Sequence, residues 1–496
     1  MPPGCARAFI GAVLLIASLA ALAAASTAAP PNIILISVDT LRSDRLPAYG
    51  YDAIRTPALD RFRADAVLFE RAWSHAPLTA PAHASMLTGR LPADHGIRDN
   101  SGFTLERHIP TVAEDLARHG YATAAMVSTK VLASKTGLAK GFAVYDQQFT
   151  PADAAERDGA ATIAAALRWI GQRKKQPYFL FLHLYEPHTP HQKMSGVADP
   201  YDAEIVRVDA LLGKFFDQLR RLRSYDSSLI VFTSDHGEGL ADHGEKQHGV
   251  LLYREALQVP LIVKFPNNAR RGARVAADAQ LIDIAPTILQ HAGANARLDA
   301  LPGMPLLALA ASNPPARTIY AESLYPRLQL GWHELHAVIA GNLHLIAGRR
   351  VELYDLARDP AERTNLVDDQ RRQSVALLRQ LRSLTHPART PAATAPDESL
   401  LGLGYLSGGS EETTYRPHPP DRIAIFNPML KLVTALKRKQ YEEALARSEE
   451  ILKTHPTFPE VWERKARALL GLKRRDEADR ALAEAMRLER ESRPSP

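Results

Sequence analysis

Residues 32–40 read Asn-Ile-Ile-Leu-Ile-Ser-Val-Asp-Thr, a short apolar run that ends on an acidic residue. The run lacks alternation between apolar and polar residues, which is typical of a strand buried on both faces of a sheet. Further runs of this kind occur at 122–127, 178–184, 229–233 and 259–263. The chain therefore offers several short, fully buried strands.

Helical patterns separate these runs. Between 205 and 222, apolar residues recur three or four positions apart, as in a helix that packs one face on a sheet. Strands that alternate with helices predict an α/β fold, namely a doubly wound, mostly parallel sheet with helices on both faces. We expect a small C-terminal subdomain after it, and then an all-α tail of helical repeats.

The composition is that of a globular protein. Of 496 residues, 46% are hydrophobic and 23% are charged, which excludes wholesale disorder. The net charge of +6 is spread along the chain, so it does not indicate a nucleic-acid-binding protein. The single cysteine, Cys5, lies in a segment that we expect to be removed, which leaves no disulfide, thiolate metal site or cysteine nucleophile.

The N-terminus resembles a secretory signal. Arg7 precedes an apolar, alanine-rich run at 9–25, and Ala23 and Ala25 offer a cleavage site of the A-x-A type. An uncleaved anchor is the alternative, but the run is short for a span of ~20 residues. We predict a signal peptide at 1–25 and an exported protein, periplasmic or secreted, without a permanent membrane span after cleavage.

The remaining chain divides by composition. We expect a catalytic domain at 31–387 and a linker at 388–424, where Thr, Pro, Gly and Ser cluster. Tyr-Glu-Glu-Ala at 441–444 recurs as Arg-Asp-Glu-Ala at 475–478, an offset of 34 residues. That period resembles tetratricopeptide repeats, predicted at 425–490, which could bind a protein partner. An unrelated helical appendage is the alternative.

Two carboxylates follow predicted strands directly. Asp39 follows 33–38, and Asp235 with His236 follows 229–234. The carboxyl ends of parallel strands form the crevice where such sheets bind ligands, so these side chains should meet there. Two carboxylates and an imidazole suit a divalent cation, although each Asp alone is more often a cap or turn residue.

A third element begins at Thr79, before Pro81 and a helical run. A hydroxyl at a helix N-terminus beside a metal has a lowered pKa and is a usable nucleophile. The alternative is that Thr79 only caps the helix.

Motifs across 31–370 carry a resemblance to a family. They are Asn32–Thr40, Thr56–Asp60, Pro81–Gly89, Thr233–Glu238, Val259–Val263 and Glu352–Leu356. In this order they resemble the sulfatases of the alkaline phosphatase superfamily. The resemblance implies a metal-dependent ester hydrolase or transferase that acts through a covalent intermediate.

The departures from the sulfatase pattern indicate a subclass. Thr79 stands where sulfatases carry the Cys or Ser that becomes formylglycine, and His83 stands where they carry an arginine. Threonine cannot form that aldehyde, whereas it resembles the nucleophile of the phosphodiesterase and headgroup-transferase branches. Asn100 resembles the asparagine that holds a phosphoryl oxygen there. Thr40 replaces a second acidic residue.

Histidines complete the predicted site. We assign His183 and His248 to general acid catalysis or charge stabilisation. His248 lies twelve residues after His236, a spacing that resembles the headgroup transferases. For His188 and His191, a role as hydrogen-bonded loop residues is nearly as plausible as a functional contact, and a second metal bound by them is the less favoured alternative.

The sequence thus predicts one divalent cation, with Zn, Mn, Ca and Mg not distinguished, bound by Asp39, Thr79, Asp235 and His236. Thr79 attacks an anionic ester, more in keeping with a phosphate (di)ester, while Asn100 stabilises charge. One alternative is a sulfuric ester hydrolase. Another is a non-catalytic scaffold that binds an anionic glycan or lipid and recruits a partner through its repeats. No nucleic acid is expected as a partner.

Overall fold

The computed structural model describes residues 30–149, 156–173, 176–310, 314–385 and 416–491. The predicted signal peptide at 1–25, with Cys5, lies outside these residues, as does the linker prediction from 388 to 415. In the described ranges no helix is long and apolar enough to cross a membrane.

A nine-stranded sheet forms the centre of the molecule, with the order β4-β3-β5-β1-β6-β7-β2-β8 and with β9 paired to β2. Its strands are β1 (Ile33–Val38), β2 (Val67–Trp73), β3 (Ala122–Met126), β4 (Val144–Asp146), β5 (Tyr178–Leu184), β6 (Leu229–Ser234), β7 (Gln258–Lys264), β8 (Arg274–Val275) and β9 (Ala279–Gln280). Strand β1 runs parallel to both of its neighbours, with Ser37 opposite His183 on β5 and opposite Thr233 on β6. This register brings the ends of β1, β5 and β6 together.

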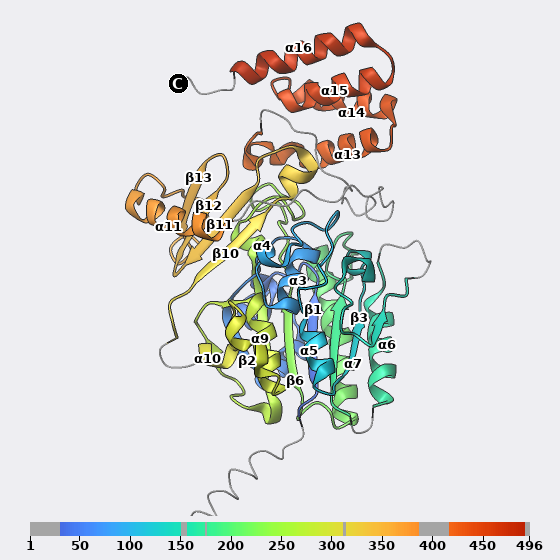
Figure 1. Ribbon diagram of the computed structural model, residues 1–496, viewed down its shortest axis with the longest axis vertical. Coiled ribbons are helices and arrows are strands. Elements are labelled where there is room, and N and C mark those ends of the chain that lie inside the picture. Colours follow the sequence, from blue (N-terminus) through green and yellow to red (C-terminus); the bar gives the residue numbers. More distant parts are fainter. Residues whose placement is uncertain (1–29, 150–155, 174–175, 311–313, 386–415, 492–496) are drawn as a thin grey trace, which may run out of the picture.

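Both faces of the sheet are covered, which explains the uninterrupted apolar strands. Ile33 and Leu35 face one apolar cluster, and Ile34 and Ile36 face another. Helices α3 (Thr79–Thr88), α5 (Val112–Arg118) and α9 (Ile284–His291) pack in the first cluster. Helices α2 (Pro57–Ala64), α6 (Gly159–Gly171) and α7 (Pro200–Arg221) pack in the second. The predicted doubly wound α/β architecture is confirmed (Figure 1).

One predicted parallel strand runs the other way. Strand β7 is antiparallel to both β6 and β2. A parallel connection needs a crossover, usually a helix, but the chain between β6 and β7 contains only the four-residue helix α8 (Arg254–Leu257). The long 235–253 loop that precedes α8 instead builds part of the site described below.

A second sheet follows in the chain. It is antiparallel, with the order β10 (Thr318–Ser323), β11 (Leu335–Ala340), β12 (Leu343–Ala347) and β13 (Val351–Asp355). Helix α11 (Arg371–Leu384) buries Leu377 and Leu381 against it. This sheet is the predicted small subdomain. The short helices α4 (Pro92–His95) and α10 (Leu306–Leu309) complete the front part of the chain.

Four helices form the C-terminal part: α13 (Phe426–Lys437), α14 (Tyr441–Thr454), α15 (Pro459–Gly471) and α16 (Arg475–Glu491). The two related tetrapeptides begin α14 and α16, as expected of consecutive helix pairs. The Phe426 ring lies 6.1 Å from Tyr325 and 6.5 Å from Trp332, between centroids. This contact packs α13 against the apolar cluster of the large sheet, and Figure 1 shows α13 as the helix of this group nearest to that sheet.

Candidate active site and metal centre

The predicted metal ligands meet at the carboxyl ends of β1 and β6. One ligand atom each from Asp39, Asp235 and His236 lies within 4.8 Å of the others. His236 Nε2 is 3.4 Å from Asp235 Oδ2 and 3.8 Å from Asp39 Oδ1. All three side chains are buried.

The residues fit a divalent cation. Asp39 Oδ1 and Asp235 Oδ2 are buried oxygens without a hydrogen-bond partner among the described residues. Burial, together with the nearby Asp235 carboxylate, holds the pKa of Asp39 well above its usual range. Two buried carboxylates repel each other unless a proton or a cation lies between them, and mixed O and N donors are those of a divalent metal.

The loops that carry the ligands are tied to each other. Thr40 adopts a left-handed backbone conformation, with φ of 57°, and its N–H donates to Asp235 Oδ1 at 3.3 Å. The N–H of Leu41 donates to Ser234 Oγ at 2.9 Å, and Ser234 Oγ donates to the His236 carbonyl at 2.6 Å. These bonds fix Asp39 relative to Asp235 across the two strands. A non-glycine residue in this conformation is strained, and here the strain serves the site.

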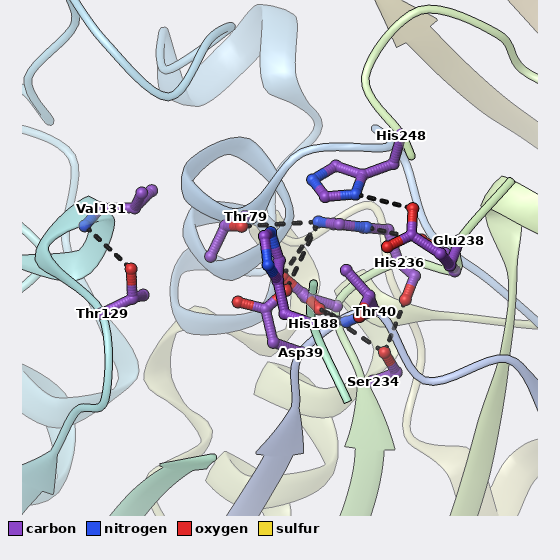
Figure 2. A network of polar contacts seen from close by, with 12 residues as sticks. Asp39, Thr40, Thr79, Thr129, Val131, His188, Ser234, His236, Glu238 and His248 are labelled. Atoms are coloured by element: carbon purple, nitrogen blue, oxygen red, sulfur yellow. Dashed lines mark hydrogen bonds and ion pairs between the residues drawn. The ribbon is translucent and has the colours of Figure 1, made fainter. Parts of the chain in front are cut away.

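Thr79 lies beside this cluster at the start of α3. Its Oγ1 is 3.5 Å from His236 Nε2. The N-cap residue of α3 is Leu78, and its side chain makes no capping hydrogen bond. Thr79 is therefore the first helical residue and not the cap. The hydroxyl is therefore directed at the metal ligands instead of at the helix amides (Figure 2).

Asn100 supplies the acceptor that the helix start lacks. Its Oδ1 accepts a hydrogen bond from the N–H of Ala80 at 2.7 Å. Its Nδ2 is buried and has no hydrogen-bond partner among the described residues. The amide is thus held next to Thr79 with one donor available for a ligand.

Two histidines line the other side of the cluster. His183, at the end of β5, places Nε2 3.4 Å from Asp39 Oδ2. His83, one turn into α3, places Nδ1 3.6 Å from Asp235 Oδ2 and bonds Ser37 Oγ through Nε2 at 2.9 Å. Burial lowers the pKa of His183 to about 4 and that of His83 to about 3, so both rings are neutral at pH 7.

His248 covers the cluster from the outside. Its ring centroid is 4.4 Å from that of His236, and its Nδ1 lies 3.1 Å from Glu238 Oε1. The ring of His188 follows at 5.0 Å from His248. Burial lowers the pKa of His248 to about 4 and raises the pKa of Glu238 to about 7. The three imidazoles form a continuous row from the metal ligands outward.

The structure brings together the residues selected from sequence, which are Asp39, Thr79, Asn100, His183, Asp235, His236 and His248. Their roles stay predictions. Sequence reasoning gave no role to Glu238, although it lies in the same motif as Asp235; it named His83 only as the residue that stands where sulfatases carry an arginine, and it left the role of His188 open. No local pattern pairs Glu238 with a histidine ten residues later, so only the folded loop could identify it.

Comparison with known proteins defines the class. Residues 31–294 of the 496 match the sulfatase family, and residues 245–386 match the C-terminal region of N-sulphoglucosamine sulphohydrolase. Residues 435–494 match a tetratricopeptide repeat. The fold and the matched span are those of a metal-dependent ester hydrolase of the alkaline phosphatase-like superfamily. Within this class, the chain belongs to the sulfatase family.

Individual relatives agree with this assignment. The chain is similar to human arylsulfatase A, at 25% identity over 70% of this chain and 86% of that protein. It is also similar to the choline-sulfatase of Rhizobium meliloti, at 23% identity over 70% and 84% of the two chains. The phosphonate monoester hydrolase of Agrobacterium radiobacter shares the fold, with a TM-score of 0.60 and 20% identity over 71% and 96%.

Proposed function

We propose that this sulfatase-family hydrolase acts through a covalent intermediate on Thr79, with phosphate (di)esters as its preferred substrates. The observation that carries the proposal is the position of Thr79 Oγ1, at the first residue of α3 and 3.5 Å from His236 Nε2 in the metal cluster. A threonine cannot be converted to formylglycine, which supports the hydroxyl itself as the nucleophile.

A divalent cation held by Asp39, Asp235, His236 and Thr79 would lower the pKa of the hydroxyl and offset charge on the ester. Thr79 Oγ forms a bond to phosphorus, its proton leaves to solvent, and the bond to the leaving-group oxygen breaks. That oxygen takes a proton from water. A second water then hydrolyses the Thr79 ester and restores the hydroxyl, so one ester and one water yield an alcohol and an acid.

The other residues of the site stabilise charge in this scheme. Asn100 Nδ2 is a buried donor beside Thr79 and would bond a non-bridging oxygen. His183 and His248 are neutral at pH 7 because burial lowers the pKa of each, which favours a role in donating hydrogen bonds over a role as imidazolium acids.

A sulfuric ester is the second candidate substrate. Support comes from the names of the curated relatives, which include an arylsulfatase and a choline-sulfatase. The phosphonate monoester hydrolase with the same fold shows that phosphorus chemistry also occurs on this fold. We further propose that the protein is exported, based on the apolar N-terminal run.

The test compares kcat/KM on bis(4-nitrophenyl) phosphate and 4-nitrophenyl sulfate for the parent protein, Thr79→Ala and Thr79→Ser. We expect faster diester turnover that is lost in Thr79→Ala and partly kept in Thr79→Ser, because serine retains the hydroxyl. Faster sulfate turnover that still requires Thr79 would support the second candidate. Turnover that survives in Thr79→Ala would exclude Thr79 as the nucleophile.

A further inference from the structure

A cleft of about 680 Å³ lies between the active-site loops and the C-terminal helices, a volume typical of small-molecule sites. One wall includes His188 and Gln247, which belong to the loops after β5 and β6. The opposite wall consists of residues from α13 to α14, among them Lys431, Arg438 and Arg447. The repeats therefore border the same space as the active-site loops.

A row of imidazoles in contact extends from the wall of this cleft to the metal ligands. His188 lines the cleft, its ring contacts His248, and the His248 ring contacts His236. An ester whose anionic group reached Thr79 would thus extend its leaving group past these rings. The leaving group would then lie against α13.

The helical wall carries excess positive charge. Lys431, Arg438 and Arg447 line it together with one acid, Glu443, which pairs with Arg447 at 3.3 Å. The exposed side chains of Lys431, on α13, and Arg438, the residue that directly follows this helix in an αR conformation, are seven residues apart, or about 10 Å along the helix direction. Both of these cationic side chains line the cleft.

The wall is held in a fixed position. Arg464 of α15 donates to the carbonyl of Leu330 at 2.5 Å, and Phe426 packs on Tyr325 and Trp332. Lys437, at the end of α13, interacts electrostatically with buried Asp99, the neighbour of Asn100. Figure 1 shows α13 on the side of the repeats that faces the large sheet.

We propose that the C-terminal helices are part of the substrate site, and that Lys431 and Arg438 bind a second anionic group on the leaving group of the ester. The proposal rests on the proposed function, since it requires the reacting ester to lie at Thr79. The substrate class is then an ester of an anionic alcohol, such as a sugar that carries a further sulfate, phosphate or carboxylate.

The test measures binding in the metal-loaded, full-length Thr79→Ala protein, so it does not depend on turnover. The probes are a disaccharide with three sulfate groups and 4-nitrophenyl sulfate, which has one. In this background, Lys431→Glu with Arg438→Glu should weaken binding of the trisulfated disaccharide about tenfold. Affinity for 4-nitrophenyl sulfate should change less than about twofold, because this probe has no second anionic group for the two cations to bind.

A matched control reverses two charges away from the cleft. Lys453→Glu with Arg475→Glu makes the same change in net charge on exposed positions of α14 and α16, and it should leave both affinities unchanged. Equal weakening in the two double variants, or unchanged disaccharide binding in Lys431→Glu with Arg438→Glu, would overturn the proposal. Unchanged binding would leave the repeats as a surface for a protein partner. A failure of Thr79 as the nucleophile would appear only in the turnover assay.

Discussion

The side chain of Asn100 makes one observed contact and has one proposed catalytic role, and two substitutions should separate the two. Its Oδ1 accepts from the N–H of Ala80 at the start of α3, and its buried Nδ2 is available for the ester. Asn100→Ala removes both groups. Asn100→Asp keeps an acceptor for Ala80 but replaces the donor with a second acceptor, which repels an anionic substrate.

The expected sizes follow from these contacts. Loss of one preorganised donor to developing charge lowers kcat by about 10²–10³-fold. Loss of a capping acceptor costs roughly 1 kcal/mol of stability, which in a chain of this size shifts Tm by about 1–2 °C. Asn100→Ala should therefore lose both activity and some stability. Asn100→Asp should lose at least as much activity but keep a Tm nearer to that of the parent, because a carboxylate is favourable at a helix N-terminus.

The assay combines kcat/KM on the better of the two aryl esters, thermal unfolding and metal content. Metal content should stay constant in both variants, since Asn100 is not among the ligands. The reasoning would be refuted if Asn100→Asp kept activity within about threefold of the parent, because the Nδ2 donor would then be dispensable. A fall in metal content that parallels the fall in activity would likewise refute it.

Three further outcomes are expected. Removal of the bound cation with EDTA should abolish turnover and lower the free energy of unfolding by about 3–4 kcal/mol, and both effects should be reversible. The reason is that the cluster would lose the charge that offsets its carboxylates. Unchanged thermal unfolding with EDTA would contradict the assigned site. Glu322→Gln should lower the free energy of unfolding by about 3–5 kcal/mol, because Arg98, whose side chain is 3% exposed, would keep a buried charge without its carboxylate partner. The second substitution Arg98→Met in the same chain should recover part of this loss, as measured by chemical denaturation. Burial raises the pKa of Asp99 to about 7, so the folded protein keeps a proton that the unfolded chain releases above about pH 4, and stability falls as the pH rises toward 7. Asp99→Asn should remove this fall, with a gain on the order of 3 kcal/mol at pH 8 relative to pH 5; parallel Tm profiles for the two proteins would show that Asp99 does not titrate in this range.

Much of the fold could be predicted because its strands are buried on both faces. Ile33–Val38 and Tyr178–Leu184 are buried throughout, are apolar except near their carboxyl ends, and match the observed strands residue for residue. The positions of Asp39 and Asp235 directly after such strands placed them at one edge of the sheet. The reversed direction of β7 was not predictable from its own residues, since direction depends on the connection and not on the strand.

The rest of the site depends on contacts between distant loops. The bond between Glu238 and His248 and the orientation of His188 arise from the course of two irregular segments, which no periodicity describes. Leu78 is the N-cap residue of α3 but has no side chain that can accept a hydrogen bond from the helix. Asn100, twenty-two residues later, accepts that bond instead, and this too is a tertiary contact. The position of α13 over the cleft follows from packing on Tyr325 and Trp332, which the repeat pattern alone cannot reveal.

The placement of α13 also affects how the substrate range of such a protein can evolve. The reacting groups all come from the edge of the large sheet, where nearly every atom is buried and substitutions are costly. Lys431 and Arg438 instead occupy exposed positions on and directly after an appended helix, where most substitutions cost little stability. Substrate range can therefore drift by point mutation on the repeats while the chemistry at the metal cluster stays intact, so selection can act on the two properties separately.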